Sequence, residues 1–169
     1  MHDWGNFYSL AGTAGASLIG LLFVMVSLGS DMPSERAITG IRVFLTPTLL
    51  HFCSALFQAL VMLAPWPSMG PAGGCLGACG VAGLVHQISV IRSRKKLAVV
   101  LHGWDDWIPY SAVPLLANVC LIAGAVGMIG EKSFALYGVA GATTLFLMAG
   151  VYGAWDLTVW MISKRRKDG

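Results

Sequence analysis

Polar residues interrupt the mostly apolar stretch Val43–Trp66, and the spacing of four of them places these four on one side of a helix. Thr48, His51, Ser54 and Gln58 fall within about a third of a helix circumference at about 100° per residue. An imidazole can accept and release protons, and hydroxyl and amide groups can hold water. We therefore interpret this stripe as the lining of a pathway through a membrane. The alternative is that these side chains hydrogen-bond within or between subunits.

His51 and His86 form a second pair that could carry chemistry. Their stretches are expected to run antiparallel, and at about 1.5 Å per residue the depths of the two histidines differ by only about 6 Å. Two such imidazoles could hold one metal ion, or a haem iron from both sides. No motif marks a haem slot, so no cofactor is expected. We interpret the histidines as structural residues that share a proton with a carbonyl or hydroxyl group, and haem binding is kept as an alternative.

Asp156 is a carboxylate inside the last apolar run, eight residues before Lys164. A charge at that depth is costly without a partner. Arg42, at the start of the second run, lies at comparable depth, so the sequence predicts an intramembrane ion pair between them. A gate or cation-binding site is the alternative.

Enzyme templates are missing. The chain has no His-Glu-x-x-His, no Gly-x-Ser-x-Gly and no phosphate loop. We therefore expect a protein that is not an enzyme and has no catalytic residues.

Long apolar helices must position these residues. The chain has 169 residues, 56% of them hydrophobic and only 11% charged, too much apolar surface for a soluble domain. A spanning helix needs about 20 mostly apolar residues. The sequence predicts an all-α, single transmembrane domain over residues 1–169, with five spans at approximately 7–28, 43–66, 72–91, 108–129 and 134–162.

Basic residues set the expected orientation. Of the 11 Lys and Arg residues, only Lys132 falls on one side of such a topology, and the positive-inside rule places the others in the cytoplasm. This gives an outer N-terminus, a cytoplasmic C-terminus and an inner-membrane location. The cytoplasmic residues are Arg36, Arg42, Arg92, Arg94, Lys95, Lys96, Lys164, Arg165, Arg166 and Lys167.

The same basic clusters suggest what the protein contacts. They lie beside helix ends, where they meet anionic lipid headgroups, and they do not form a nucleic-acid surface. Residues 93–104 have apolar positions at helical spacing on one side, which is typical of an interfacial helix at the cytoplasmic headgroups.

Small residues recur at four-residue steps in several runs. Examples are Gly12, Ala16 and Gly20 in the first and Gly73 with Gly77 in the third. Such stripes let helix backbones approach closely in lipid. We therefore expect a compact bundle that assembles as a parallel homo-oligomer.

The opening stretch Trp4–Ser27, with Phe7, Gly12, Ala16 and the run Gly20-Leu-Leu-Phe-Val24, resembles a family of small uncharacterised bacterial polytopic membrane proteins. The resemblance covers the first helix, implies a bacterial inner-membrane location and carries no activity.

Together these features favour a channel or transport pathway for ions or small solutes. One alternative is a non-conducting scaffold or regulator that binds a partner membrane complex. A second alternative is a haem-binding electron carrier.

Overall fold

The computed structural model describes residues 2–29, 35–96 and 108–168, with side chains described for residues 4–28, 45–89, 92 and 110–163. The described chain is helical and contains no strand, which confirms the predicted all-helical class. Its elements are α1 (His2–Gly29), α2 (Glu35–Leu63), α3 (Met69–Lys96), the π-helical turn η1 (Ile108–Ala112), α5 (Val113–Ile129) and α6 (Ala135–Asp168).

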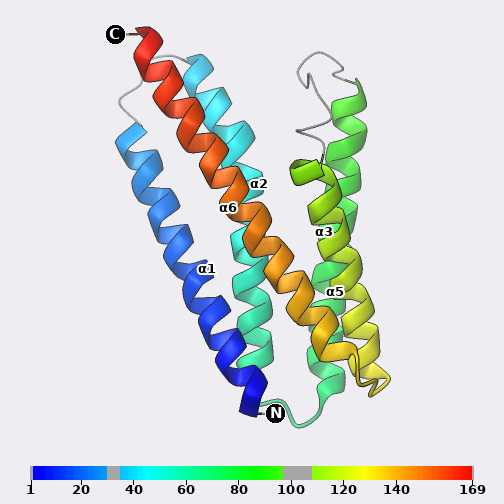
Figure 1. Cartoon of the computed structure of the whole chain (residues 1–169). Coiled ribbons are helices and arrows are strands. Elements are labelled where there is room, and N and C mark those ends of the chain that lie inside the picture. Colours follow the sequence, from blue (N-terminus) through cyan, green and yellow to red (C-terminus); the bar gives the residue numbers. More distant parts are fainter. Residues whose placement is uncertain (1, 30–34, 97–107, 169) are drawn as a thin grey trace.

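The long helices run up and down, and the two termini lie at opposite ends of the bundle (Figure 1). The end that holds the N-terminus also holds the turns at 64–68 and 130–134. Of the predicted interfacial helix 93–104, the first four residues continue α3, and the rest lies outside the described residues.

Three of the four main helix contacts join helices that follow one another along the chain, and the fourth joins α2 to the distant α6. α2 packs against α1 and α6, and α5 packs against α6 and α3, whereas α2 and α3 barely touch. The bundle therefore has two arms, one of α1, α2 and α6 and one of α3, η1 and α5. α6 crosses from α5 at the N-terminal end to α1 and α2 at the C-terminal end (Figure 1).

Glycines make the crossing of α5 and α6 close. A Cβ on Gly124 would lie 2.8 Å from the Val139 nitrogen, and one on Gly138 would lie 3.1 Å from the Gly124 Cα. Backbones can approach this closely only where a side chain is missing. The two arms are thus held together firmly at the N-terminal end.

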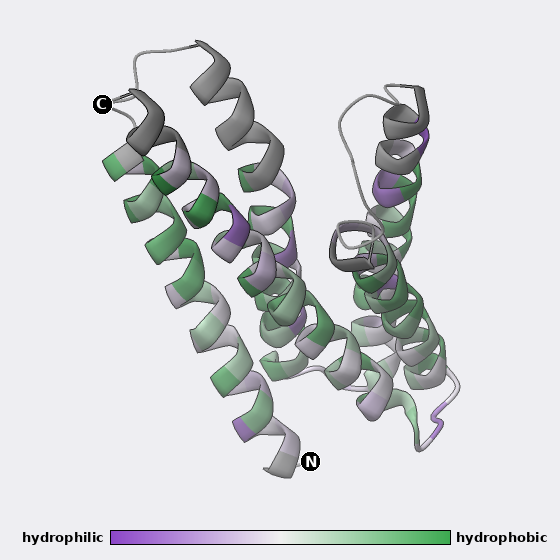
Figure 2. Cartoon of the chain, turned by 45° about the horizontal axis from the view of Figure 1, so that its top comes forward, coloured by the Kyte–Doolittle hydropathy of each residue, from purple (hydrophilic) through white to green (hydrophobic). Residues whose placement is uncertain are grey.

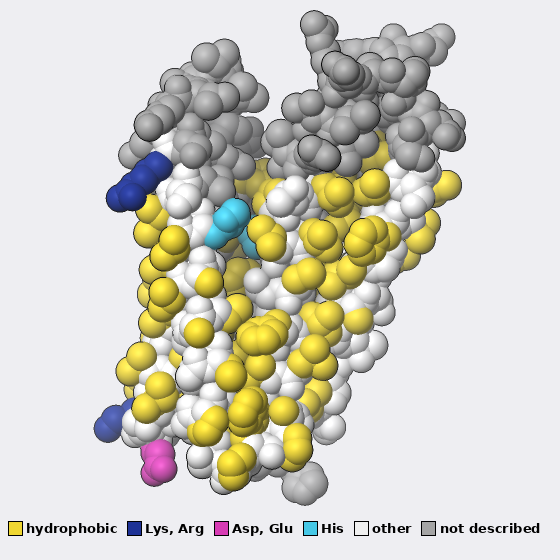
Figure 3. Space-filling model, turned by 180° about the vertical axis from the view of Figure 1, so that it is seen from behind, with side chains coloured by type: hydrophobic (Ala, Val, Ile, Leu, Met, Phe, Trp, Pro, Cys, Tyr) yellow, Lys and Arg dark blue, Asp and Glu magenta, His cyan; other side chains and the backbone are white. Residues whose placement is uncertain are grey.

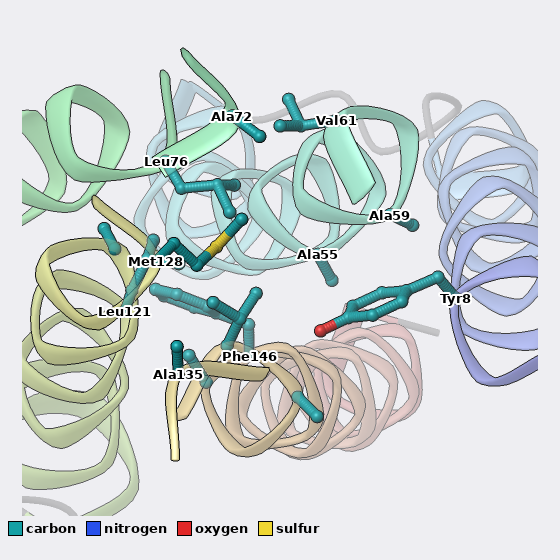
Figure 4. Close-up of a cluster of buried hydrophobic side chains, with 14 of the residues drawn as sticks. Tyr8, Ala55, Ala59, Val61, Ala72, Leu76, Leu121, Met128, Ala135 and Phe146 are labelled. Carbon is teal, nitrogen blue, oxygen red and sulfur yellow. The ribbon is translucent and has the colours of Figure 1, made fainter. Parts of the chain in front are cut away.

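Two groups of buried apolar side chains follow from this arrangement. The larger group joins all five long helices and includes Tyr8, Ala55, Leu76 and Phe146 (Figure 4). The smaller one, Leu22, Phe52, Leu157 and Met161, belongs to the arm of α1, α2 and α6 alone.

The predicted fourth span begins with η1 rather than with α-helix. Pro109 is the second residue of this turn and Pro114 follows it, and proline has no backbone N–H for the α-helical ladder. A wider π turn is a common response to such a disruption.

Four helical segments are long and apolar enough to cross a membrane: Trp4–Leu28, Leu45–Leu63, Tyr110–Ile129 and Ala135–Ser163. The chain therefore has the make-up of a multi-pass membrane protein. α3 is not among them; it is rich in glycine and carries His86 and Gln87. Figure 2 shows apolar residues along most of the helices, with hydrophilic positions on α3 and α6 toward the C-terminal end.

Candidate functional site

The polar stripe of α2 lies against α6. The Thr48 side chain lies against Gly153. A Cβ added to Gly153 would overlap the hydroxyl oxygen of Thr48. The His51 ring lies 6.0 Å from the Phe146 ring, centroid to centroid. Thr48, His51 and Gln58 are buried, whereas Ser54 is half-buried. The structure therefore brings three of the four predicted residues into one helix interface.

Two further residues, Thr143 and Tyr8, belong to this interface. Thr143 on α6 is fully buried and contacts Gln58. Tyr8 on α1 is 1% exposed, and its hydroxyl points between α2 and α6 (Figure 4). We call the five residues Thr48, His51, Gln58, Thr143 and Tyr8 the polar seam.

The polar seam contains buried atoms without partners. Among the described residues, three buried side-chain nitrogen or oxygen atoms have no hydrogen-bond partner: Tyr8 Oη, His51 Nδ1 and Gln58 Nε2. All three come from the seam. Leaving such an atom unpaired costs about 1–3 kcal/mol, so buried polar groups in proteins normally bind water where protein offers no partner.

The contact between Gln58 and Thr143 shows why the seam cannot satisfy itself. Thr143 Oγ1 lies 2.9 Å from Gln58 Oε1 and 2.9 Å from the Val139 carbonyl oxygen. A hydroxyl has one proton and can donate to only one of them. If it donates to Val139, the Gln58 amide must turn its nitrogen toward Thr143. In either orientation, one polar atom of Gln58 keeps no protein partner.

Aromatic rings cover the seam at the N-terminal end. Trp4 lies 5.0 Å from Tyr137 of α6 and 6.1 Å from Phe7, and Phe7 lies 5.0 Å from Tyr8, each measured between ring centroids. These rings separate Tyr8 from the end of the bundle, so the seam is closed on this side.

A hollow lies between the two arms on the face opposite to Figure 1, and histidine side chains are visible in it (Figure 3). The histidines whose side chains the structure describes are His51 on α2 and His86 on α3. His86 is exposed and His51 is buried. The predicted pair thus comes from the two arms, with His51 on α2, where it belongs to the polar seam, and His86 on α3.

Tyr110 connects the two arms toward the C-terminal end. Its hydroxyl donates to Asp156 Oδ2 of α6 over 2.6 Å. Its carbonyl accepts a hydrogen bond from Gln87 Nε2 of α3 over 3.0 Å. Pro114 has no N–H to offer to this carbonyl four residues earlier, and Gln87 supplies the missing donor. We call Tyr110, Asp156 and Gln87 the latch.

The latch gives Asp156, one residue of the predicted ion pair, a hydrogen-bond partner that the sequence did not predict. The Arg42 side chain lies outside the described residues, so its contact with Asp156 stays a prediction. Asp156 is half-buried and has Tyr110 as a hydrogen-bond partner.

The predicted small-residue positions fall into two groups. A Cβ on Gly12 would lie 3.1 Å from Ala59, and one on Gly73 would lie 2.8 Å from the Ala125 carbonyl oxygen. Gly77 would make an ordinary contact with Ala125. By contrast, Gly20 has nothing within 4 Å and Ala16 is exposed, so these two point away from the rest of the chain.

Sequence reasoning missed Tyr8, Thr143, Tyr110 and Gln87. Gln87 offered a signal, because an amide beside His86 in an apolar helix is costly in lipid. Tyrosine and threonine are common at membrane interfaces and in helices, so the other three gave none.

Metal binding has limited support from the residues present. No group of three or more His, Cys, Asp or Glu side chains that could hold an ion occurs in the part of the chain that the structure describes. Two imidazoles alone would need the remaining ligands from elsewhere, as a haem would provide.

No known protein family, curated protein or solved structure matches this chain.

Proposed function

We propose that this chain is a transport protein of the bacterial inner membrane, in which the polar seam is the pathway for ions or small solutes. One observation supports this proposal most directly. The unpaired buried polar atoms of the described chain all lie along one seam, and they are Tyr8 Oη, His51 Nδ1 and Gln58 Nε2. Leaving three buried polar groups unpaired costs more free energy than the membrane helices gain by packing closely around them. Water or a passing solute is the partner that they need.

The path would run from the hollow, past His51 and Gln58, to Tyr8. Its inner section opens at the histidines, and its outer section is closed by the rings of Trp4, Tyr137 and Phe7. This arrangement corresponds to a state that is open on one side, which is the basis of alternating access.

Five spans with the C-terminus in the cytoplasm fit this proposal. The termini lie at opposite ends, and α3 has 28 residues and packs along α5. Arg92 lies near the C-terminal end and Lys132 in the opposite turn, in agreement with a cytoplasmic C-terminal end. α1 is the most exposed span, with 17% of its apolar window buried, which leaves a surface for a second subunit.

Thiol accessibility tests the path. The four native cysteines, which are free, are first replaced. Single cysteines are then placed at positions 51 and 58, with Leu50 and Phe57, which are exposed on the apolar surface, as matched controls on the same helix. We expect a small, uncharged, water-soluble thiol reagent to label positions 51 and 58 and to leave the controls unlabelled, because water reaches only the seam and a thiol that faces lipid is not ionised.

Flux into liposomes completes this test. Transport of at least one small ion or solute, together with labelling at position 51, supports the proposal. A seam that stays unlabelled in a protein that moves no ion rejects it and leaves the scaffold interpretation.

A further inference from the structure

We infer that the species carried along the polar seam is the proton, moving over internal water molecules and the seam's own side chains. This inference rests on the proposed function and adds the identity of the substrate. It draws on three features of the seam: its tightness, the kind of groups that line it and their spacing.

The seam is too tight for a hydrated ion. Gly150 meets the Phe52 ring and Gly153 meets Thr48, in both cases so closely that a single added carbon would overlap. Gln58 and Thr143 are completely buried. An ion would have to shed its water to pass, and it would need fixed ligands in exchange.

The lining does not offer such ligands. Among the described side chains, the acidic residues are Glu131, in the turn before α6, and Asp156, which lies one turn beyond Gly153 and is bound by Tyr110. The seam itself has only neutral hydroxyl, amide and imidazole groups. Without a carboxylate, a dehydrated cation is not stabilised at this depth.

A proton needs neither space nor fixed charge, because it passes from one hydrogen bond to the next. Imidazole suits this role: it takes a proton on one ring nitrogen and releases the other proton from the second nitrogen, so the ring is neutral before and after. The hydroxyl groups of Tyr8 and Thr143 can likewise accept one proton as they pass on another. Gln58 anchors water rather than relaying the proton.

Water molecules fit the spacing. His51 and Gln58 are seven residues apart, or about 10 Å along the helix, which is three to four hydrogen-bond lengths of about 2.8 Å. Ala55, a small residue, lies between them on the same helix face and is buried. The unpaired atoms at both ends of this interval would bind the first and last of these waters.

Liposomes that contain a pH-sensitive dye test the inference. A potassium gradient with valinomycin sets the membrane potential, and proton entry is recorded with the purified full-length protein. We expect proton flux without sodium, potassium or chloride flux. Gln58→Met keeps the shape of the side chain but removes the anchor for water. It should lower the proton flux about tenfold, because the loss of one hydrogen bond that holds this water raises the barrier to proton movement.

Asn118→Leu is the matched control, since Asn118 is also a buried amide but lies outside the seam, where it bonds to the Pro114 carbonyl. It should keep the flux of the native protein. Ala55→Leu, which fills the seam, should stop the flux, and Ala82→Leu on the exposed surface of α3 should not. Size and thermal stability in detergent identify the folded variants. If Ala55→Leu does not fold, the proton flux of Gln58→Met alone tests the route through the seam.

The outcomes separate the two proposals. Flux of potassium, sodium or chloride without protons overturns this inference and leaves the transport function standing. Proton flux that is unchanged in folded Gln58→Met overturns the route through the seam. The absence of any flux overturns both.

Discussion

The two ends of the bundle are held together by different groups. At the N-terminal end, helices meet through glycine, with Gly124 against the Val139 backbone and Gly73 against the Ala125 carbonyl. Toward the C-terminal end, the arms are joined by the hydrogen bond that the Tyr110 hydroxyl donates to Asp156 of α6. Backbone contacts allow little adjustment, whereas a side-chain hydrogen bond can break while both helices stay intact. The comparison identifies the N-terminal end as the fixed base and the C-terminal end as the part that can open.

The largest effect should come from breaking the base. Gly124→Val places a side chain where the Val139 nitrogen lies 2.8 Å from the Cβ position, and two helix backbones must separate. We expect a loss of about 3 kcal/mol, at the upper end of typical overpacking effects. Unfolding in mixed micelles followed by circular dichroism measures it. Gly141→Val is the control, because nothing lies within 4 Å of that position; equal losses in both variants would contradict the assignment.

A smaller effect should follow from opening the latch. Tyr110→Phe removes the hydroxyl that donates to Asp156 and should cost about 1.5–2 kcal/mol, in the lower part of the range for a hydrogen bond to a charged group. The distance between spin labels on Val85 of α3 and Val159 of α6, both exposed, should become longer or more broadly distributed. Tyr137→Phe serves as the control, because Tyr137 is exposed. An unchanged distance distribution would show that the latch does not hold the arms.

Double-mutant cycles sharpen this prediction by asking which partner Asp156 uses. Asp156→Asn is combined with Tyr110→Phe in one cycle and with Arg42→Gln in another. A larger coupling with Tyr110 is expected from the hydrogen bond. A larger coupling with Arg42 would instead support the ion pair that the sequence predicts.

The smallest effect on the folded chain should come from Gly20→Leu, because Gly20 faces open space. Thermal stability should change by no more than about 0.5 kcal/mol. If α1 forms the contact between subunits, the same variant should reduce the size of the assembly, which light scattering in detergent measures. Gly12→Leu, directed at Ala59, should destabilise the chain itself. Loss of stability in Gly20→Leu without any change in size would argue against an α1 interface.

Much of the fold follows from the sequence, because a long apolar run has few alternatives to a helix. Residues such as Leu10, Leu60 and Val126 are exposed on the surface, as a lipid-facing residue requires. The packing order of the helices was not predictable. α2 packs against α6, almost a hundred residues away, because Gly150 and Gly153 accept Phe52 and Thr48 there.

The site was predicted in part. The spacing of Thr48, His51 and Gln58 indicates a shared helix face, and these residues do share one. Helical periodicity cannot reveal which neighbour that face meets, so the roles of Thr143 and Tyr8 required the structure. Ser54 lies toward the margin of the stripe and is only half-buried.

Because α2 packs against α6 and barely touches α3, the order in which the helices are synthesised matters for folding. α2 leaves the ribosome long before α6, so Thr48 and Gln58 enter the membrane without the helix that covers them. α3 likewise waits for α5, its main partner. The early helices must therefore be held by lipid or by the insertion machinery until synthesis of the last span is complete. A chain that ends before Ala135 would carry uncovered polar residues in the bilayer and would be a substrate for membrane proteases.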